Sequence, residues 1–538
     1  MPAVDWVVSL VLAATTFATR WPYRAHLLPT WDAVQFALAL ERYDIVRHQP
    51  HPPGYILYVG LGRLAELVFG EPAVALDSLA IVASAVAVLL LYRLGWQLYG
   101  RGVALVAASG LVASPLFWAH GMVGLPYAAE AALATGIAIG AWDMRRGSIR
   151  ALVGSAVLLG LAGGVRQSLL LTMGTLWLGM AWRGFRRPRP ILAGLSLVAL
   201  STATWLLPML WLTGVERYLA AGADLYASTV RATTVFGDGW SRNVTGLAVA
   251  LLVGLGVFLP VFAWELCRLP RALSARGDRA ALFALWIVPA LAVYVLVHFG
   301  QPGYLLTVLP GCYLLVGRAL MRLWPAPTAS AAPRLRRAAV GLVLGVGVAA
   351  HGAFFMLARP VDVPTPAANA PEAARIAAEL RALYRFRLWS HSAPGLREQE
   401  AVITEYVAAI RGHFDPHDTV LVTELGNPRS YPWFRHVMYY LPEYAAYHLR
   451  IGEVGPGYLL SRDLASMATV ADWRVPLPPT TRRLVWVVDQ WHPGLPRPAD
   501  VETRPLPYGR FLYVTRVRRS AVEHAGYRLV PVTAVARR

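Results

Sequence analysis

The sequence predicts a polytopic α-helical membrane protein that carries a smaller α/β domain at its C-terminal end. Of the 538 residues, 56% are hydrophobic and only 15% are charged. The first two-thirds of the chain contains roughly eleven apolar runs, each close to the about 20 residues needed to cross a bilayer's hydrocarbon layer. Within lipid, the backbone polar groups of such runs can bond only to one another, so the runs are predicted to be helices.

The arginines between the apolar runs predict the topology. The first span is predicted at residues 4–19, and the short loops between the later spans are rich in arginine. The positive-inside rule places those loops in the cytoplasm, which puts the N-terminus inside and residues from 360 onward outside. The remaining spans are predicted at 76–98, 103–119, 125–143, 151–165, 168–182, 190–212, 244–266, 281–299, 303–321 and 338–358.

A short apolar stretch at residues 52–69 is predicted to be an interfacial helix rather than a span. It contains Arg63 and Glu66. Counting it as a span would move the arginines at 93 and 101 outside and break the alternation of the loops. A helix of this kind lies in the plane of the membrane surface, here on the outer leaflet.

The charge distribution excludes a nucleic-acid binder. The net charge is +19, and all 50 basic residues are arginines. Many of them lie in short loops between apolar runs, so the expected partner is the lipid bilayer. The two cysteines, Cys267 and Cys312, fall in or beside apolar runs, so no disulfide framework is expected.

The chain is predicted to divide into a transmembrane domain at 1–359 and an extracytoplasmic, periplasmic α/β domain at 360–538. A Pro/Ala-rich linker at 364–372 separates the two. Beyond it, amphipathic helices followed by short β-branched or aromatic strands are typical of a small α/β domain. The helices are predicted at 372–384 and 397–411, and the strands at 419–423, 484–489 and 511–516.

The first outer loop, residues 20–75, contains the leading candidate for chemistry. It carries Asp32, His48 and His51. An acidic residue near the outer face of a polytopic protein has a chemical role more often than a structural one. Asp32 is predicted to have a catalytic role, and capping of a helix that begins at Ala33 is the alternative, although one carboxylate can both cap a helix and accept a proton.

Four sequence features resemble one family of membrane enzymes. They are Trp31-Asp32, His51-Pro52-Pro53-Gly54-Tyr55, Gln97-Leu98-Tyr99-Gly100-Arg101, and Ser114-Pro115-Leu116-Phe117-Trp118 followed by Leu125-Pro126-Tyr127-Ala128-Ala129-Glu130. In order and spacing they resemble the GT-C glycosyltransferases, in the branch of the protein O-mannosyltransferases and aminoarabinose transferases. The resemblance covers residues 1–320.

The resemblance implies a GT-C-like fold, a polyprenyl-phosphate-linked sugar donor, and an active site on the extracytoplasmic face of a bacterial inner membrane. It also implies that the first-loop acid, Asp32, acts as a general base or orients the acceptor. The acceptor is left open among a lipid, a glycan and a protein. Where the family often has a second acid beside or three residues after the aspartate, this chain has Ala33 and Gln35. No metal site is therefore predicted, although a divalent ion is left open as a cofactor that the sequence does not require.

Further residues join the predicted site. Glu130, at the outer start of the fourth span, is a second catalytic acid by family analogy or a member of a structural ion pair. Arg166 is predicted to bind the donor phosphate, with snorkelling to lipid headgroups as the alternative. His48, His51 and Tyr55 form a predicted substrate loop, in which the histidines assist proton transfer or metal binding, or else order the loop.

A transporter or flippase of lipid-linked sugars is the alternative function. Such proteins show paired broken helices and charges at the membrane midplane. Here the charges gather at the outer ends of the predicted spans, and no internal repeat is visible. The enzyme is therefore the favoured interpretation.

Overall fold

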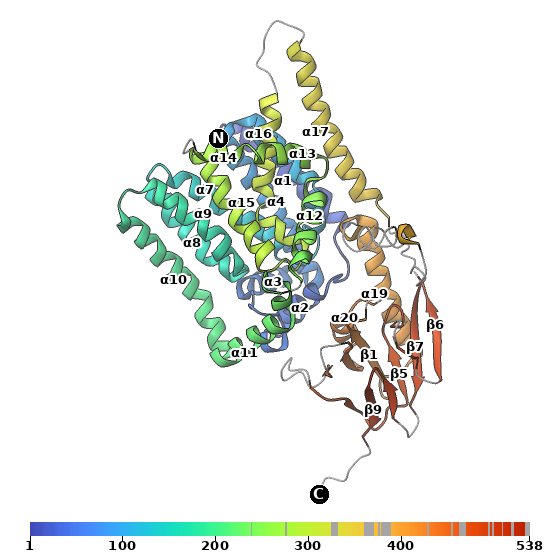
Figure 1. The fold of residues 1–538 in the computed structure, drawn as a ribbon. Helices are drawn as coiled ribbons and strands as arrows, with labels where there is room; N and C mark the ends of the chain where they lie inside the picture. The colour runs from blue at the N-terminus through green and yellow to red at the C-terminus, as the bar shows by residue number, and fades with distance from the viewer. Residues whose placement is uncertain are drawn as a thin grey trace. The chain divides into compact units, whose positions relative to one another are not determined.

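The computed structural model forms two compact units, described separately below (Figure 1). The membrane unit contains Met1–Ala25 and Pro52–Leu396, and the α/β unit contains His26–His51 and Arg397–Arg538. The structure describes the chain except for residues 238, 275–276, 324–331, 360–370, 375–376, 378–388, 428–429, 453–455, 462–469, 493–494, 498–499, 508, 518–520 and 533–538. Most of the linker predicted at 364–372 and most of the helix predicted at 372–384 lie outside the described residues, and the domain boundary at 359/360 stays a prediction.

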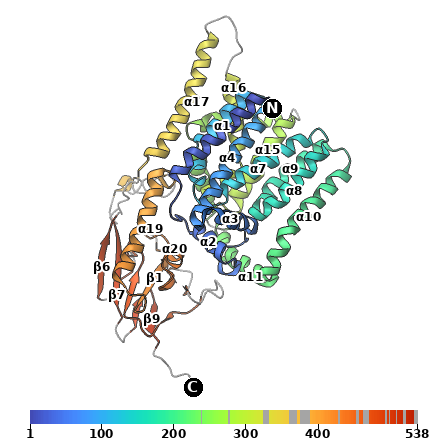
Figure 2. The ribbon, with the colours of Figure 1, turned by 180° about the vertical axis from the view of Figure 1, so that it is seen from behind.

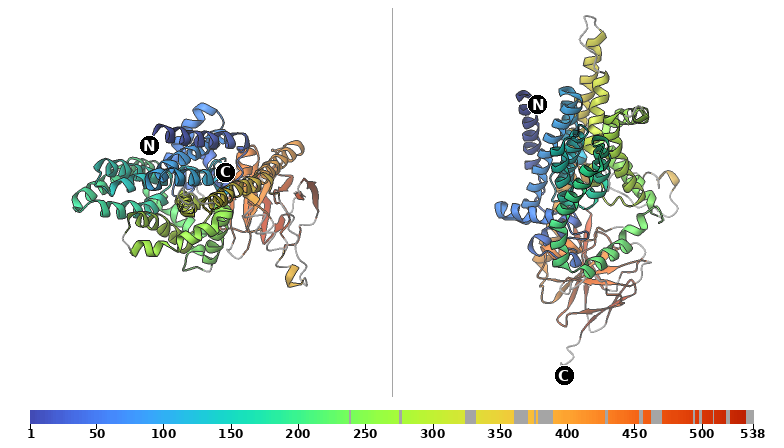
Figure 3. Two further views of the ribbon diagram at one scale, coloured as in Figure 1. Left: turned by 90° about the horizontal axis from the view of Figure 1, so that it is seen from above. Right: turned by 90° about the vertical axis from the view of Figure 1, so that its left-hand side faces the viewer.

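The membrane unit is built from helices that follow the apolar runs. Its long helices lie alongside one another (Figures 2 and 3). They are α1 (Ala3–Arg20), α3 (Ile56–Phe69), α4 (Pro72–Tyr99), α5 (Arg101–Ala113), α6 (Pro115–His120), α7 (Tyr127–Met144), α8 (Ile149–Val165), α9 (Ser168–Gly184), α10 (Pro188–Thr213), α11 (Val215–Leu225), α12 (Trp240–Leu255), α13 (Leu259–Leu266), α14 (Leu269–Ser274), α15 (Asp278–Leu296), α16 (Leu309–Leu323) and α17 (Ala332–Leu357).

Six helical segments of the described chain are long and apolar enough to cross a membrane. α5 and α8 are apolar but shorter. The described chain is therefore helical and multi-pass in character, while the count of about eleven crossings and their orientation stay predictions. The six segments are Ala3–Tyr23, Pro72–Tyr99, Pro188–Thr213, Trp240–Arg271, Asp278–Leu296 and Ala338–Leu357.

The span predicted at 103–119 is two helices rather than one. The break falls at Ser114, where α5 ends and α6 begins. Pro115 has no backbone N–H to continue the hydrogen-bond ladder of α5. The Ser114 hydroxyl instead donates to the Gly254 carbonyl at 2.7 Å, which ties the break to α12.

Two later predicted spans are also interrupted. The run at 244–266 breaks at Gly256, whose φ is 47°. Glycine adopts this left-handed conformation readily because it has no side chain. The run at 303–321 begins with a 3₁₀ helix, Pro302–Thr307, before α16 starts at Leu309. Apolar composition identified these segments but not the points at which the backbone turns.

The α/β unit joins the first-loop segment, residues 26–51, to the C-terminal region, residues 397–538. The predicted helix at 397–411 lies within α19 (Ala393–His413), and the three predicted strands are β1, β5 and β7. With these three strands included, the elements of the unit besides α19 are α2 (Trp31–Glu41), α20 (Phe434–Tyr440), β1 (Thr419–Leu425), β2 (Ala445–Arg450), β3 (Tyr458–Leu460), β4 (Arg474–Leu477), β5 (Arg483–Trp486), β6 (Val501–Leu506), β7 (Arg510–Arg516), β8 (Val522–His524) and β9 (Tyr527–Pro531).

A six-stranded sheet in the order β3-β2-β1-β5-β7-β6 forms the centre of this unit. β1 runs parallel to β2 and β5, with Val420 opposite Ala445 and Leu484, and the outer pairs are antiparallel. On one face the sheet packs against α19 and α20, and Ile410 and Phe434 are fully buried there. A second sheet, in the order β4-β9-β8, shares the apolar core that includes β1, β2 and β5.

Because the first-loop segment and the C-terminal region form one compact unit, both must lie on the same side of the membrane. In a Cys267→Ser background, single cysteines at the exposed positions Glu41 and Glu405 are expected to react with a membrane-impermeant reagent in intact cells. A cysteine at the exposed Arg187, in a predicted inner loop, is expected to stay unlabelled. Labelling at Arg187 alone would reverse the predicted orientation.

Candidate functional site

The first turn of α2 presents the predicted general base. The helix is capped by Thr30, whose side-chain oxygen accepts from the Ala33 N–H at 3.2 Å. The capping residue is thus Thr30 and not Asp32, which corrects the alternative role considered for that carboxylate. Asp32 lies in the first helical turn, where the helix dipole stabilises a negative charge.

Asp32 lies in a small polar cluster with Gln35 and His51. Gln35 is three residues after Asp32 on the same helix, so the two side chains share a face. The His51 Nδ1 lies 2.7 Å from the Gln35 Oε1 and 3.8 Å from the Asp32 Oδ1. Because an amide oxygen only accepts, this contact is a hydrogen bond when the His51 Nδ1 carries a proton. The side chains of Asp32 and His51 keep 23% and 17% of their surface exposed, so a substrate can reach them.

His48 is held in a tight turn near this cluster. Its φ is 54°, and the turn is closed by paired backbone hydrogen bonds between Asp44 and Gln49. Burial lowers the pKa of His48 to about 3, and the nearby charges of Arg435 and His51 add to the effect. The imidazole is therefore neutral near pH 7, and its assignment to the substrate loop stays a prediction.

Buried histidines predict that the α/β unit loses stability in acid. Burial lowers the pKa of His436 to about 4 and that of His48 and His448 to about 3. A histidine in an unfolded chain has a pKa of about 6.5. Below that pH the unfolded chain therefore binds more protons than the folded unit, and the stability of the unit falls as the pH drops. After correction for intrinsic rates, amides of α20 and β2 should lose hydrogen-exchange protection from pH 6.5 to 4. Changing the exposed His413 to Gln should leave this loss unaltered, and constant protection would contradict the expectation.

The membrane unit brings together Glu130 and Arg166. Glu130 lies in the first turn of α7, and Arg166 follows the last residue of α8. The Arg166 Nη1 donates to the Glu130 Oε1 at 2.5 Å, and the Thr307 hydroxyl donates to the Oε2 at 3.1 Å. The side chains of Arg166 and Glu130 are only 6% and 1% exposed. This burial does not fit an arginine that snorkels to the lipid headgroups.

Aromatic rings enclose the Arg166 guanidinium. Its central carbon lies 3.9 Å from the centre of the Tyr304 ring and 5.0 Å from that of Tyr127. Tyr127 is buried in the interior of the unit. Cation–π contacts with the two rings stabilise the guanidinium, whose N–H groups can bind a planar or tetrahedral anion.

The predicted motif at residues 51–55 reaches the turn that carries Arg166. Gln167 donates from its Nε2 to the Pro53 carbonyl at 3.0 Å. Tyr55 is 8% exposed and adopts a left-handed conformation, with φ of 45°, at the start of α3. The motif thus forms part of the surroundings of Arg166, and the substrate-binding role of Tyr55 stays a prediction.

Three residues of these clusters were not predicted as site residues. Gln35 could have been found from its i+3 spacing after Asp32 on one helix. Thr307 and Tyr304 lie about 175 residues beyond Glu130 in the sequence, as the separation of 177 between Thr307 and Glu130 shows. Their contacts with Glu130 and Arg166 cannot be predicted from the local sequence, because only the fold brings these residues together.

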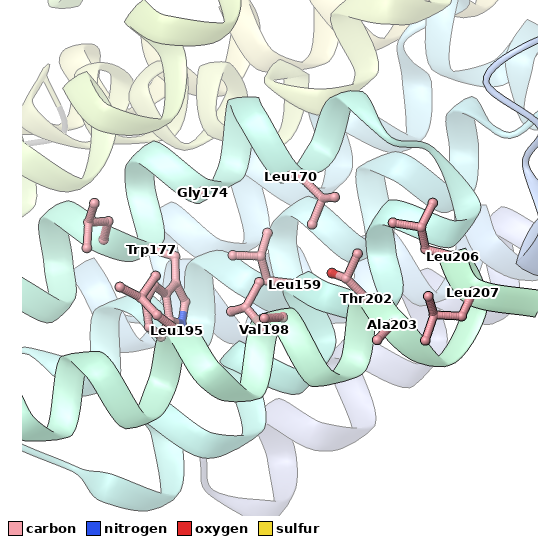
Figure 4. Close-up of a pocket in the computed structure, with 12 residues that line it drawn as sticks. Leu159, Leu170, Gly174, Trp177, Leu195, Val198, Thr202, Ala203, Leu206 and Leu207 are labelled. Atoms are coloured by element: carbon pink, nitrogen blue, oxygen red, sulfur yellow. The ribbon is translucent and has the colours of Figure 1, made fainter. Parts of the chain in front are cut away.

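The described residues contain no group of three or more His, Cys, Asp or Glu side chains that could hold a metal ion. An apolar groove with a volume of about 430 Å³ lies between α8, α9 and α10 (Figure 4). Leu159, Trp177 and Leu206 are among the residues that line it, and none of the predicted site residues does. The groove therefore has no acid–base chemistry of its own.

Known proteins resemble this chain in one domain and in fold. Residues 46–189 match the model of the protein O-mannosyl-transferase TMEM260 N-terminal domain. Apo ArnT from Cupriavidus metallidurans is similar with a TM-score of 0.55 and 15% identity over 96% of this chain and 98% of that one. ArnT from the same organism bound to undecaprenyl phosphate gives 0.54 and 13% over 95% and 98%. No curated protein sequence matches the chain.

The matched domain contains His48, His51, Tyr55, Glu130 and Arg166, whereas Asp32 precedes it. At such low identity the two ArnT structures show a shared fold, and they show it over nearly the whole chain. Together with the matched domain, this fold confirms that the chain resembles the GT-C superfamily of membrane glycosyltransferases, in the protein O-mannosyltransferase and aminoarabinose-transferase branch.

Proposed function

We propose that this protein transfers a sugar from a polyprenyl-phosphate-linked donor to an acceptor at the outer face of the membrane. The family model of a protein O-mannosyl-transferase favours a mannosyl or related hexosyl donor. The structural relative that is bound to undecaprenyl phosphate supports a lipid-phosphate carrier. The observation that carries the proposal is the partly exposed Asp32 carboxylate, held beside His51 in the first turn of α2.

In the proposed reaction, Asp32 accepts the proton of an acceptor hydroxyl as its oxygen attacks the anomeric carbon. The bond between that carbon and the phosphate oxygen breaks, and polyprenyl phosphate leaves with its electron pair. A positioned carboxylate contributes about 10²- to 10⁴-fold to such a step. Gln35 and His51 hold the carboxylate's surroundings in place through the 2.7 Å contact between them.

Arg166 is proposed to bind the phosphate of the donor. Its guanidinium is fixed by the two tyrosine rings and by Glu130, which leaves the arginine oriented before the donor arrives. A guanidinium can bind two phosphate oxygens at once and stabilise the charge that develops on the leaving group. The pairing with Arg166 supports a positioning role for Glu130, while its action as a second catalytic acid stays a prediction.

The test is to incubate the purified, lipid-reconstituted protein with a panel of polyprenyl-phosphate sugars and a membrane extract that supplies acceptors. We expect one donor, a mannosyl or related hexosyl one, to be consumed with release of polyprenyl phosphate. The matched control is the same preparation with the Asp32→Asn variant. Failure of the wild-type protein to consume any donor in the panel would contradict the proposal.

A further inference from the structure

The helix that carries Asp32 is held by side chains of the C-terminal region. The Trp31 N–H, next to Asp32, donates to the Tyr431 hydroxyl at 2.7 Å. Just before the helix, the Leu28 N–H donates to the Tyr440 hydroxyl at 2.8 Å, and its carbonyl accepts from the His436 Nε2 at 3.0 Å. These bonds join residues about 400 positions apart, as the Trp31–Tyr431 separation of 400 shows.

One of these contacts, that of the Trp31 N–H, falls at a place where a helix lacks partners of its own. The first N–H groups of an α-helix have no intrahelical acceptor. Thr30 satisfies the Ala33 N–H, and Tyr431 satisfies the Trp31 N–H from outside the segment. The cap of α2 is therefore completed by the C-terminal region, and the Asp32 carboxylate is not the residue that caps it.

Arg435, on α20, contacts the same segment near both of its ends. Its Nη2 donates to the Arg47 carbonyl at 3.1 Å, near the end of the segment, and its guanidinium lies 5.6 Å from the centre of the Trp31 ring, near the beginning. The Trp31 ring also lies against His448 of β2, with ring centres 5.8 Å apart. Contacts at both ends restrict rotation of α2 as well as its translation.

We infer that Tyr431, Arg435, His436 and Tyr440 are positioning residues for Asp32. The C-terminal region then helps to form the catalytic site. The inference rests on the proposed function of Asp32. A general base must lie within hydrogen-bond reach of its proton, and a displacement of about 1 Å can cost about 100-fold in rate. The C-terminal region therefore acts on the chemical step, in addition to any part in acceptor choice.

The test compares three hydroxyl deletions in the full-length protein. Tyr431→Phe and Tyr440→Phe each remove the acceptor of a backbone N–H on the first-loop segment. Tyr513→Phe is the matched control, because the Tyr513 hydroxyl also accepts a buried backbone N–H, that of Trp491 at 3.2 Å, but does so within the C-terminal region. We expect kcat to fall about 10-fold or more in the first two variants, with donor KM changed less than about twofold, and to stay near wild type in the control.

Amide hydrogen exchange of residues 27–33 supplies a readout that needs no activity. Faster exchange there in Tyr431→Phe, but not in Tyr513→Phe, is expected whether or not a donor has been found. Unchanged exchange, or equal kcat values in Tyr431→Phe and Tyr513→Phe, would overturn the positioning role. Absence of transfer by the wild-type protein would instead refute the proposed function, so the two failures are distinguishable.

Discussion

Replacing Asp32 with Asn is expected to abolish sugar transfer while the protein stays folded. Asparagine has the size and an oxygen of the aspartate, but it cannot accept the proton of the acceptor. The loss should be about 100-fold or more in kcat. Because Thr30 rather than Asp32 caps α2, the substitution leaves the helix cap in place. The effect is measured as the rate at which polyprenyl phosphate is released.

Glu41 supplies the control for this prediction. It is an exposed acid at the other end of the same helix, so Glu41→Gln makes the same chemical change without touching the cluster. We expect the Glu41 variant to retain wild-type turnover. Near-normal transfer by Asp32→Asn, or an equal loss in both variants, would rule out the general-base role.

The second large effect concerns the buried pair of Glu130 and Arg166. Replacing Arg166 with Ala leaves the Glu130 carboxylate buried beside the Thr307 hydroxyl without its ion-pair partner. Removing one partner of a buried ion pair costs about 3–5 kcal/mol of stability. We therefore expect Arg166→Ala to lower the thermal midpoint of the purified protein markedly and to abolish donor binding.

A double variant separates stability from donor binding. Apolar residues of similar volume in place of a buried pair are often neutral or stabilising, so Glu130→Met with Arg166→Met should recover most of the stability. If Arg166 binds the donor phosphate, the double variant still fails to bind donor. Arg166→Lys keeps the charge but loses the bidentate fork, so donor KM should rise. Wild-type donor KM in the double or the Lys variant would show that the pair is structural only.

The sequence alone was sufficient for the helical class and for many helix positions. Apolar runs such as 76–98 and 190–212 correspond to α4 and α10 because length and composition decide whether a segment is helical in lipid. The breaks at Ser114 and Gly256 were missed because hydropathy does not register a proline or a positive φ inside an apolar run.

The site was predicted in its residues but not in its partnerships. Asp32 and His51 were identified as separate candidates, and the structure brings them together through Gln35. Glu130 and Arg166, 36 positions apart, likewise prove to be partners. The sequence analysis did not predict that residues 26–51 and the C-terminal region form one compact unit. Hydrogen bonds such as that of Trp31 with Tyr431 depend on tertiary structure and leave no local pattern.

The most direct measurement for the central claim uses proteoliposomes loaded with a doubly labelled donor, carrying one label on the sugar and one on the polyprenyl phosphate. An enzyme separates the two labels: the sugar appears on an acceptor and polyprenyl phosphate is released, with Asp32→Asn inactive in the same vesicles. We predict this result for the wild-type protein. Movement of the intact donor from one leaflet to the other, with both labels still joined and no difference between the wild type and Asp32→Asn, would contradict glycosyl transfer and identify a transporter instead.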